Sequence, residues 1–123
     1  MALSAQELRI GNWYNEYGIP KQATSDFIDR LYIIQKAGKT ALDVSDIPIT
    51  EEWLWRFGDD QVSEIPPIEV IVQDRFLFIW KEPYHYWYVV TLGSHEYLTK
   101  IEFVHEYQNF IFTLTGEELV LSK

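Results

Sequence analysis

The segment from residue 68 to residue 92, IEVIVQDRFLFIWKEPYHYWYVVTL, carries the strongest structural signal in the chain. Its β-branched and aromatic residues fall into three runs, at 68–72, 75–81 and 86–92, separated by polar or proline-containing stretches. This pattern predicts an antiparallel three-stranded meander. The middle run contains Phe76–Trp80, which is apolar on both of its alternating faces. We expect it in the centre of the sheet, because only a strand covered on both faces suits that pattern.

The residues around Thr50 predict a short helix. Thr50 is a good N-cap, because its hydroxyl accepts a hydrogen bond from the backbone of the first turn. Glu51 and Glu52 follow, where negative charge favours the positive end of the helix dipole. Gly58 is a typical C-terminal stop, which gives a helix of about two turns.

A longer helix is predicted to begin at Thr99, which has capping-box spacing to Glu102, and to end near residue 114, before Gly116. Its apolar residues cover more than half of its circumference, so we expect it to be the main helix packed on the sheet. Gln108 lies within the apolar arc, and we expect its amide to bond to the backbone of a strand or loop. A narrow polar stripe contains Glu102, His105, Glu106, Asn109 and Thr113.

Residues 24–47 permit two interpretations. As a helix, the segment begins at an N-cap on Thr24 or the serine after it and ends at Gly38. As strands, residues 31–35 and 40–44 form a hairpin around a Lys-Ala-Gly-Lys turn. We favour the strands, because the run Tyr-Ile-Ile in the first of them has high β-propensity.

These elements predict an α+β fold in a single domain spanning residues 1–123. Its parts are a small antiparallel β-sheet, one long C-terminal helix packed against it, and a short acidic helix. A chain of this length buries a sufficient core without disulfides or a structural metal.

The composition excludes several classes of function. The chain has no cysteine, which removes disulfides, thiolate catalysis and cysteine-bound zinc. With 10 basic and 19 acidic residues and a net charge of −9, direct binding to nucleic-acid phosphates is not expected. The first residues do not resemble a signal peptide, and the longest apolar run is too short to cross a bilayer. We therefore expect a cytoplasmic protein without a membrane contact.

The negative charge is concentrated in residues 43–69, which hold eight acidic residues and one basic residue. The short helix in this segment carries Trp53, Trp55 and Phe57, whose even spacing cannot place all three on one helical face. We expect Trp55 to be the exposed one. An aromatic side chain within an acidic surface is a plausible interaction hot spot. The candidate interaction residues are Glu51, Glu52, Trp55, Asp59 and Asp60.

A second candidate site combines the aromatic strands with the polar stripe of the long helix. Such a pocket would bind a small ligand or support minor acid–base chemistry. Its residues are His85, Trp87, His105, Gln108 and Asn109. The order His-Glu-x-x-Asn at 105–109 lacks the second histidine of the helical zinc motif, so we expect no metal and no cofactor.

Three blocks of sequence resemble a known group of proteins. They span residues 8–13, 48–58 and 104–119, the last containing Val-His-Glu-Tyr-Gln-Asn-Phe-Ile-Phe and Leu-Thr-Gly-Glu-Glu-Leu. Together they resemble small proteins encoded in phages, prophages and mobile elements of Bacteroidota, a group with no established activity. The resemblance implies genomic context rather than chemistry, and it adds weight to strands in residues 24–47.

The sequence thus favours an accessory protein of phage or mobile-element type that is not an enzyme. Its acidic surface would bind a protein partner with a basic surface, because opposite charges steer such encounters. The alternative is a small-ligand-binding domain or minor enzyme that uses the aromatic strands with His85 and His105. The oligomeric state is left open.

Overall fold

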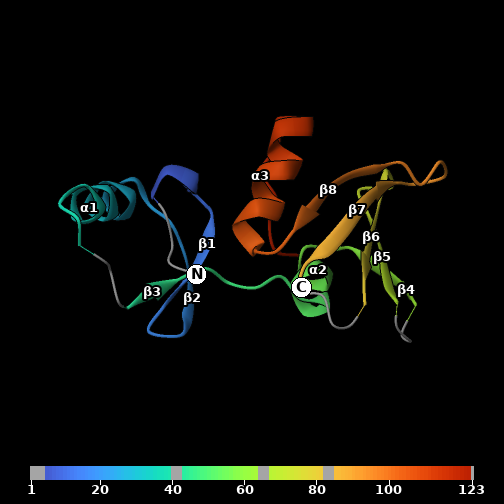
Figure 1. Ribbon diagram of the computed structural model, residues 1–123, viewed down its shortest axis with the longest axis horizontal. Coiled ribbons are helices and arrows are strands. Elements are labelled where there is room, and N and C mark those ends of the chain that lie inside the picture. The colour runs from blue at the N-terminus through green and yellow to red at the C-terminus, as the bar shows by residue number, and fades with distance from the viewer. Residues whose placement is uncertain (1–4, 40–42, 64–66, 82–84, 123) are drawn as a thin grey trace.

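The computed structural model describes residues 5–39, 43–63, 67–81 and 85–122, without the side chains of residues 60–63. Figure 1 shows an elongated molecule with a five-stranded sheet at one end and a helix, α1, at the other. The C-terminal helix, α3, stands between them beside the sheet. The expected α+β class is confirmed.

The larger sheet is an antiparallel meander in the order β4-β5-β6-β7-β8. Its inner three strands match the predicted runs, and β6 lies in the centre as expected. Phe78 in β6 pairs with Val70 on one side and Val89 on the other, and all three are buried. The strands are Asp60–Ser63 (β4), Ile68–Val72 (β5), Phe76–Trp80 (β6), Trp87–Thr91 (β7) and Tyr97–Ile101 (β8).

Helix α3 spans Val104–Thr115 and covers one face of this sheet. The predicted start at Thr99 is wrong, because that residue lies in β8. Strand pairing with β7 holds the backbone extended there, and the cap forms further on: the carboxylate of Glu106 accepts hydrogen bonds from the backbone N–H groups of Glu102 and Phe103. The predicted end is confirmed, with Gly116 at a positive φ of 74°.

Helix α2 spans Glu51–Arg56 and has the predicted limits. The Thr50 hydroxyl accepts a hydrogen bond from the N–H of Trp53 at 3.3 Å. Gly58 follows the C-cap with a φ of +96°, which a residue with a Cβ adopts only under strain. Here the sequence predicts the element correctly because its caps are local signals.

The preference for strands in residues 24–47 is wrong over most of its length. Residues Ser25–Lys36 form α1, which is as long as α3, so the described part of the chain has two helices of twelve residues rather than one. Thr24 caps α1 by accepting from the N–H of Phe27. Residues 40–42 lie outside the described part of the chain, and only Val44–Ser45 form a strand, β3.

A second, three-stranded antiparallel sheet has the order β2-β1-β3, with β1 at Trp13–Glu16 and β2 at Ile19–Gln22. A single-turn 3₁₀ helix, η1, precedes it at Ala5–Glu7. α1, η1 and this sheet enclose a small hydrophobic cluster that includes Tyr14 stacked on Phe27. The larger cluster lies between the five-stranded sheet, α2 and α3.

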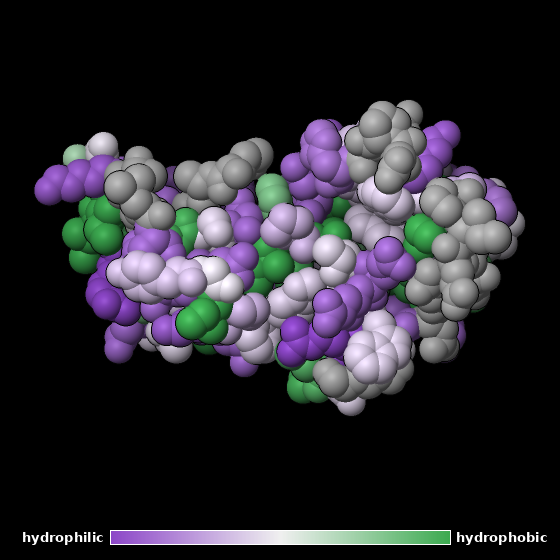
Figure 2. Space-filling view, turned by 90° about the horizontal axis from the view of Figure 1, so that it is seen from below, coloured by the Kyte–Doolittle hydropathy of each residue, from purple (hydrophilic) through white to green (hydrophobic). Residues whose placement is uncertain are grey.

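Some large hydrophobic side chains lie outside the two clusters and are exposed, among them Tyr17, Ile19, Ile33 and Trp55. Figure 2 views the molecule from below and shows mostly hydrophilic and weakly polar residues, with hydrophobic residues in small separate patches. Within the described part of the chain, no helix is long and apolar enough to span a membrane.

Candidate functional site

Four of the five predicted interaction residues line one hollow beside α2. The hollow has a volume of about 460 Å³, and we call it the acidic hollow. Glu51 and Glu52 are exposed on the first turn of α2, while Asp59 lies just beyond its end. The side chain of Asp60 is outside the described part of the chain. The lining residues are Thr50, Glu51, Glu52, Trp55, Asp59 and Val70.

Trp55 is 53% exposed, which confirms the choice made from the sequence. Trp53 and Phe57 turn into the core, where the Trp53 ring lies 5.6 Å from Trp13 and 6.0 Å from Phe57 between ring centroids. Because these two rings anchor α2, the third aromatic residue of the helix is left at the surface. The exposed indole and the two glutamates therefore face one hollow from a well-anchored helix.

Asp59 has a different role from the one expected, because its side chain is buried. Its Oδ2 accepts a hydrogen bond of 2.5 Å from the hydroxyl of Tyr107, which is itself fully buried on α3. Burial and the nearby Asp59 raise the pKa of Tyr107, so this hydroxyl stays protonated and remains a donor. Asp59 thus links the lining of the acidic hollow to α3.

A second hollow also includes the start of α2 in its lining. It has a volume of about 340 Å³, and we call it the tryptophan hollow. Trp80 and Trp87, from neighbouring strands, lie 6.4 Å apart between ring centroids and are tilted by 39°. The indole N–H of Trp87 donates to the carbonyl of Ile49 at 3.2 Å. The lining residues are Pro48, Ile49, Thr50, Glu51, Trp80, His85 and Trp87.

The predicted second site is divided by the structure. His85 and Trp87 line the tryptophan hollow, whereas His105, Gln108 and Asn109 are not among its lining residues. These three lie on α3, and each contacts the N-terminal segment of the chain. The five residues therefore do not form one pocket.

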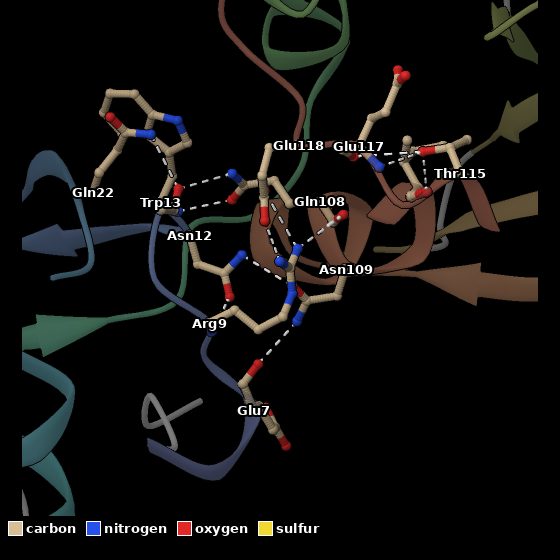
Figure 3. Close-up of polar contacts among 12 residues, drawn as sticks. Glu7, Arg9, Asn12, Trp13, Gln22, Gln108, Asn109, Thr115, Glu117 and Glu118 are labelled. Carbon is tan, nitrogen blue, oxygen red and sulfur yellow. Dashed lines mark hydrogen bonds and ion pairs between the residues drawn. The ribbon is translucent and has the colours of Figure 1, made fainter. Parts of the chain in front are cut away.

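Gln108 is completely buried, and its amide forms hydrogen bonds with the backbone of the N-terminal segment, as the sequence predicted. Its Oε1 accepts from the N–H of Trp13 at 2.8 Å, and its Nε2 donates to the carbonyl of Gly11 at 3.0 Å. Figure 3 shows both bonds crossing from α3 to the start of β1. The amide is a structural link rather than a ligand contact.

Asn109 extends this link (Figure 3). Its Oδ1 accepts from Arg9 Nε at 2.8 Å and from Asn12 Nδ2 at 3.0 Å, and its Nδ2 donates to the carbonyl of Glu7 at 2.9 Å. Arg9 also pairs with Glu118 beyond the end of α3. Arg9 and Asn12 had no signal in the sequence, because their partners lie about a hundred residues away.

His105 belongs to the predicted polar stripe, but its side chain is buried, at 1% exposed. Its Nδ1 lies 3.7 Å from Asp46 Oδ1, and its Nε2 lies 3.5 Å from Glu7 Oε2. The N-terminal segment covers this face of α3, and a helical projection of α3 alone cannot show contacts with other parts of the chain. A ring this buried presents no surface to a substrate, so the Asp46–His105 pair does not form an accessible acid–base site.

The face of the sheet opposite α3 carries a row of tyrosines. The rings of Tyr86 and Tyr88 are 5.3 Å apart, and Tyr97 continues the row at 6.1 Å from Tyr88. Lys100 lies over the ring of Tyr86 at 4.9 Å. Packing between neighbours on one segment (Tyr86 and Tyr88) and across strands (Tyr88 and Tyr97) accounts for this row, and one cation already lies against it.

Comparisons with known proteins gave no match to a family model, to a curated protein or to a solved structure. Across the described residues, no group of three or more histidine or carboxylate side chains is arranged to hold a metal ion. The two hollows beside α2 are therefore judged on their own geometry.

Proposed function

We propose that this chain is a non-catalytic accessory protein, of phage or mobile-element type, that binds a basic surface of a protein partner. The acidic hollow is the binding site. The observation that carries the proposal is the shared position of Glu51, Glu52 and the exposed Trp55 around this one hollow.

The chemistry of the hollow suits an arginine or lysine side chain. A guanidinium or ammonium group gains from the two carboxylates, and the face of an indole attracts a cation as well. An exposed tryptophan is also typical of binding hot spots. The remaining acidic residues of the segment from 43 to 69 would increase the rate of encounter with a positively charged partner.

The experiment is a pull-down from a Bacteroidota lysate with the full chain as bait. We expect a basic protein to be recovered by the wild type and lost with Trp55→Ala and with the double variant Glu51→Gln/Glu52→Gln. Recovery should also fall as salt is raised, because exposed charges are screened at high ionic strength. Asp59 is left unchanged, since its bond to Tyr107 supports the fold.

The matched control is Asp26→Asn/Asp29→Asn, which removes the same charge from two exposed positions of α1. This variant should recover the partner as well as the wild type does. Equal loss in both double variants would indicate a dependence on net charge alone, and full recovery by the α2 variants would refute the acidic hollow as the site.

A further inference from the structure

The acidic hollow and the tryptophan hollow are adjacent. They share two lining residues, Thr50 and Glu51, at the start of α2. One hollow is bordered by carboxylates and an exposed indole, and the other is walled by Trp80 and Trp87. A single occupant that reaches across Thr50 would therefore meet a cation site and an apolar site in succession.

The tryptophan hollow offers mainly apolar contact. The indole N–H of Trp87 is already bonded to the carbonyl of Ile49, and Pro48 and Ile49 add apolar lining. The only histidine of the lining, His85, has its Nε2 3.7 Å from a carboxylate oxygen of Glu102. At about 340 Å³ the hollow is large enough for one bulky side chain or a small ligand.

We propose that the two hollows together bind a peptide segment that carries an arginine or lysine close to a large apolar or aromatic residue. The basic residue enters the acidic hollow, and the apolar residue packs on Trp80 and Trp87. This inference rests on the proposed function for its basic half and adds the identity of the neighbouring residue. Charge complementarity fixes the orientation, because Glu52 lines only the acidic hollow, while Glu51 lies where the two hollows meet.

The surface around the hollows supports a short segment rather than a broad interface. The two hollows have volumes of about 460 and 340 Å³, and they meet at Thr50 and Glu51. A partner that gains affinity from this face does so through a few anchored side chains, which is how short peptide motifs bind.

The experiment is an NMR titration of the ¹⁵N-labelled full chain with capped peptides. The probes hold one arginine and one phenylalanine separated by one to three glycines, and matched peptides replace the arginine with glutamate or the phenylalanine with alanine. The indole N–H signals of Trp55 and Trp80 report the two hollows separately. We expect both signals to shift with the best arginine–phenylalanine spacing. That peptide should bind about tenfold more tightly than the alanine peptide, since one large apolar side chain is buried.

Glu52→Gln should weaken binding of the arginine–phenylalanine peptide several-fold and leave binding of the glutamate peptide unchanged. If the alanine peptide binds equally well, the inference is overturned and the proposed function stands. If the glutamate peptide binds equally well through the Trp80 signal alone, both are overturned in favour of an apolar small-ligand site. The absence of shifts at millimolar peptide also overturns the inference.

Discussion

A buried carboxyl and a buried imidazole face each other where the N-terminal part of the chain meets α3. Asp46 and His105 are both almost fully buried, and neither the Asp46 Oδ1 nor the two ring nitrogens has a hydrogen-bond partner among the described residues. Burial raises the pKa of Asp46 to about 6; His105 opposes this rise, and Glu7 and Glu106 add to it. The Asp46 carboxyl therefore titrates in a range where most carboxyl groups are already ionised.

We predict that Asp46→Asn changes how stability depends on pH. The folded protein keeps the Asp46 proton up to about pH 6, whereas the unfolded chain loses it near 3.8. This protonation therefore stabilises the fold below about pH 4, and the contribution is lost as pH rises through 6. The free energy of unfolding of Asp46→Asn relative to wild type should rise between pH 4 and 7 by on the order of 3 kcal/mol.

The measurement is urea denaturation at several pH values, followed by tryptophan fluorescence. Asp29→Asn is the control, because Asp29 is exposed on α1. The difference from the wild type should change more with pH for Asp46→Asn than for Asp29→Asn. A difference for Asp46→Asn that is constant with pH would show that the Asp46 carboxyl titrates alike in the folded and unfolded states.

Helix α1 shows how local and long-range signals compete. The run Tyr32-Ile33-Ile34 has strong β-propensity, yet these three side chains are exposed on the outer side of a helix. The buried residues are Phe27 and Leu31, whose spacing of four places them on one helical face. Tertiary burial of that face on the small sheet outweighs the propensity of the exposed residues.

We predict that Thr24→Ala destabilises the protein by about 1 kcal/mol, because the N–H of Phe27 loses its cap. Urea denaturation followed by circular dichroism at 222 nm measures the change. The control is Thr113→Ala, at an exposed position within α3. That substitution should be neutral or slightly stabilising, because alanine favours helix interiors. An equal effect of the two substitutions would mean that the cap contributes nothing to the helix.

The sequence predicted features that depend on near neighbours and failed on those that depend on distant ones. The meander and the caps of α2 follow from short patterns, and the exposure of Trp55 follows from helical geometry. The start of α3 was misplaced because the residues around Thr99 pair with β7 and form a strand. The burial of His105 and Asp59 was missed because the covering residues come from other parts of the chain.

The arrangement of the two hydrophobic clusters raises the question of what holds the ends of the molecule together. Among the described residues the smaller cluster contains seven buried ones, too few to support an independent domain. Its connection to α3 is largely polar: Gln108 and Asn109 bond to the segment from Glu7 to Trp13 (Figure 3). We infer that the smaller cluster folds only when docked on α3.

We predict that Asn109→Ala loosens this docking before it disturbs the larger sheet. The substitution removes the bonds from Arg9 and Asn12 and the bond to the carbonyl of Glu7. The cost should be on the order of 2 kcal/mol, because partly buried polar groups lose their partners. Native-state hydrogen exchange should show a larger loss of protection in α1 and β1 than in β6. Asn15→Ala, within β1, is the control and should leave both ends nearly unchanged. Equal losses in α1 and β6 would instead show that the two clusters unfold as one cooperative unit.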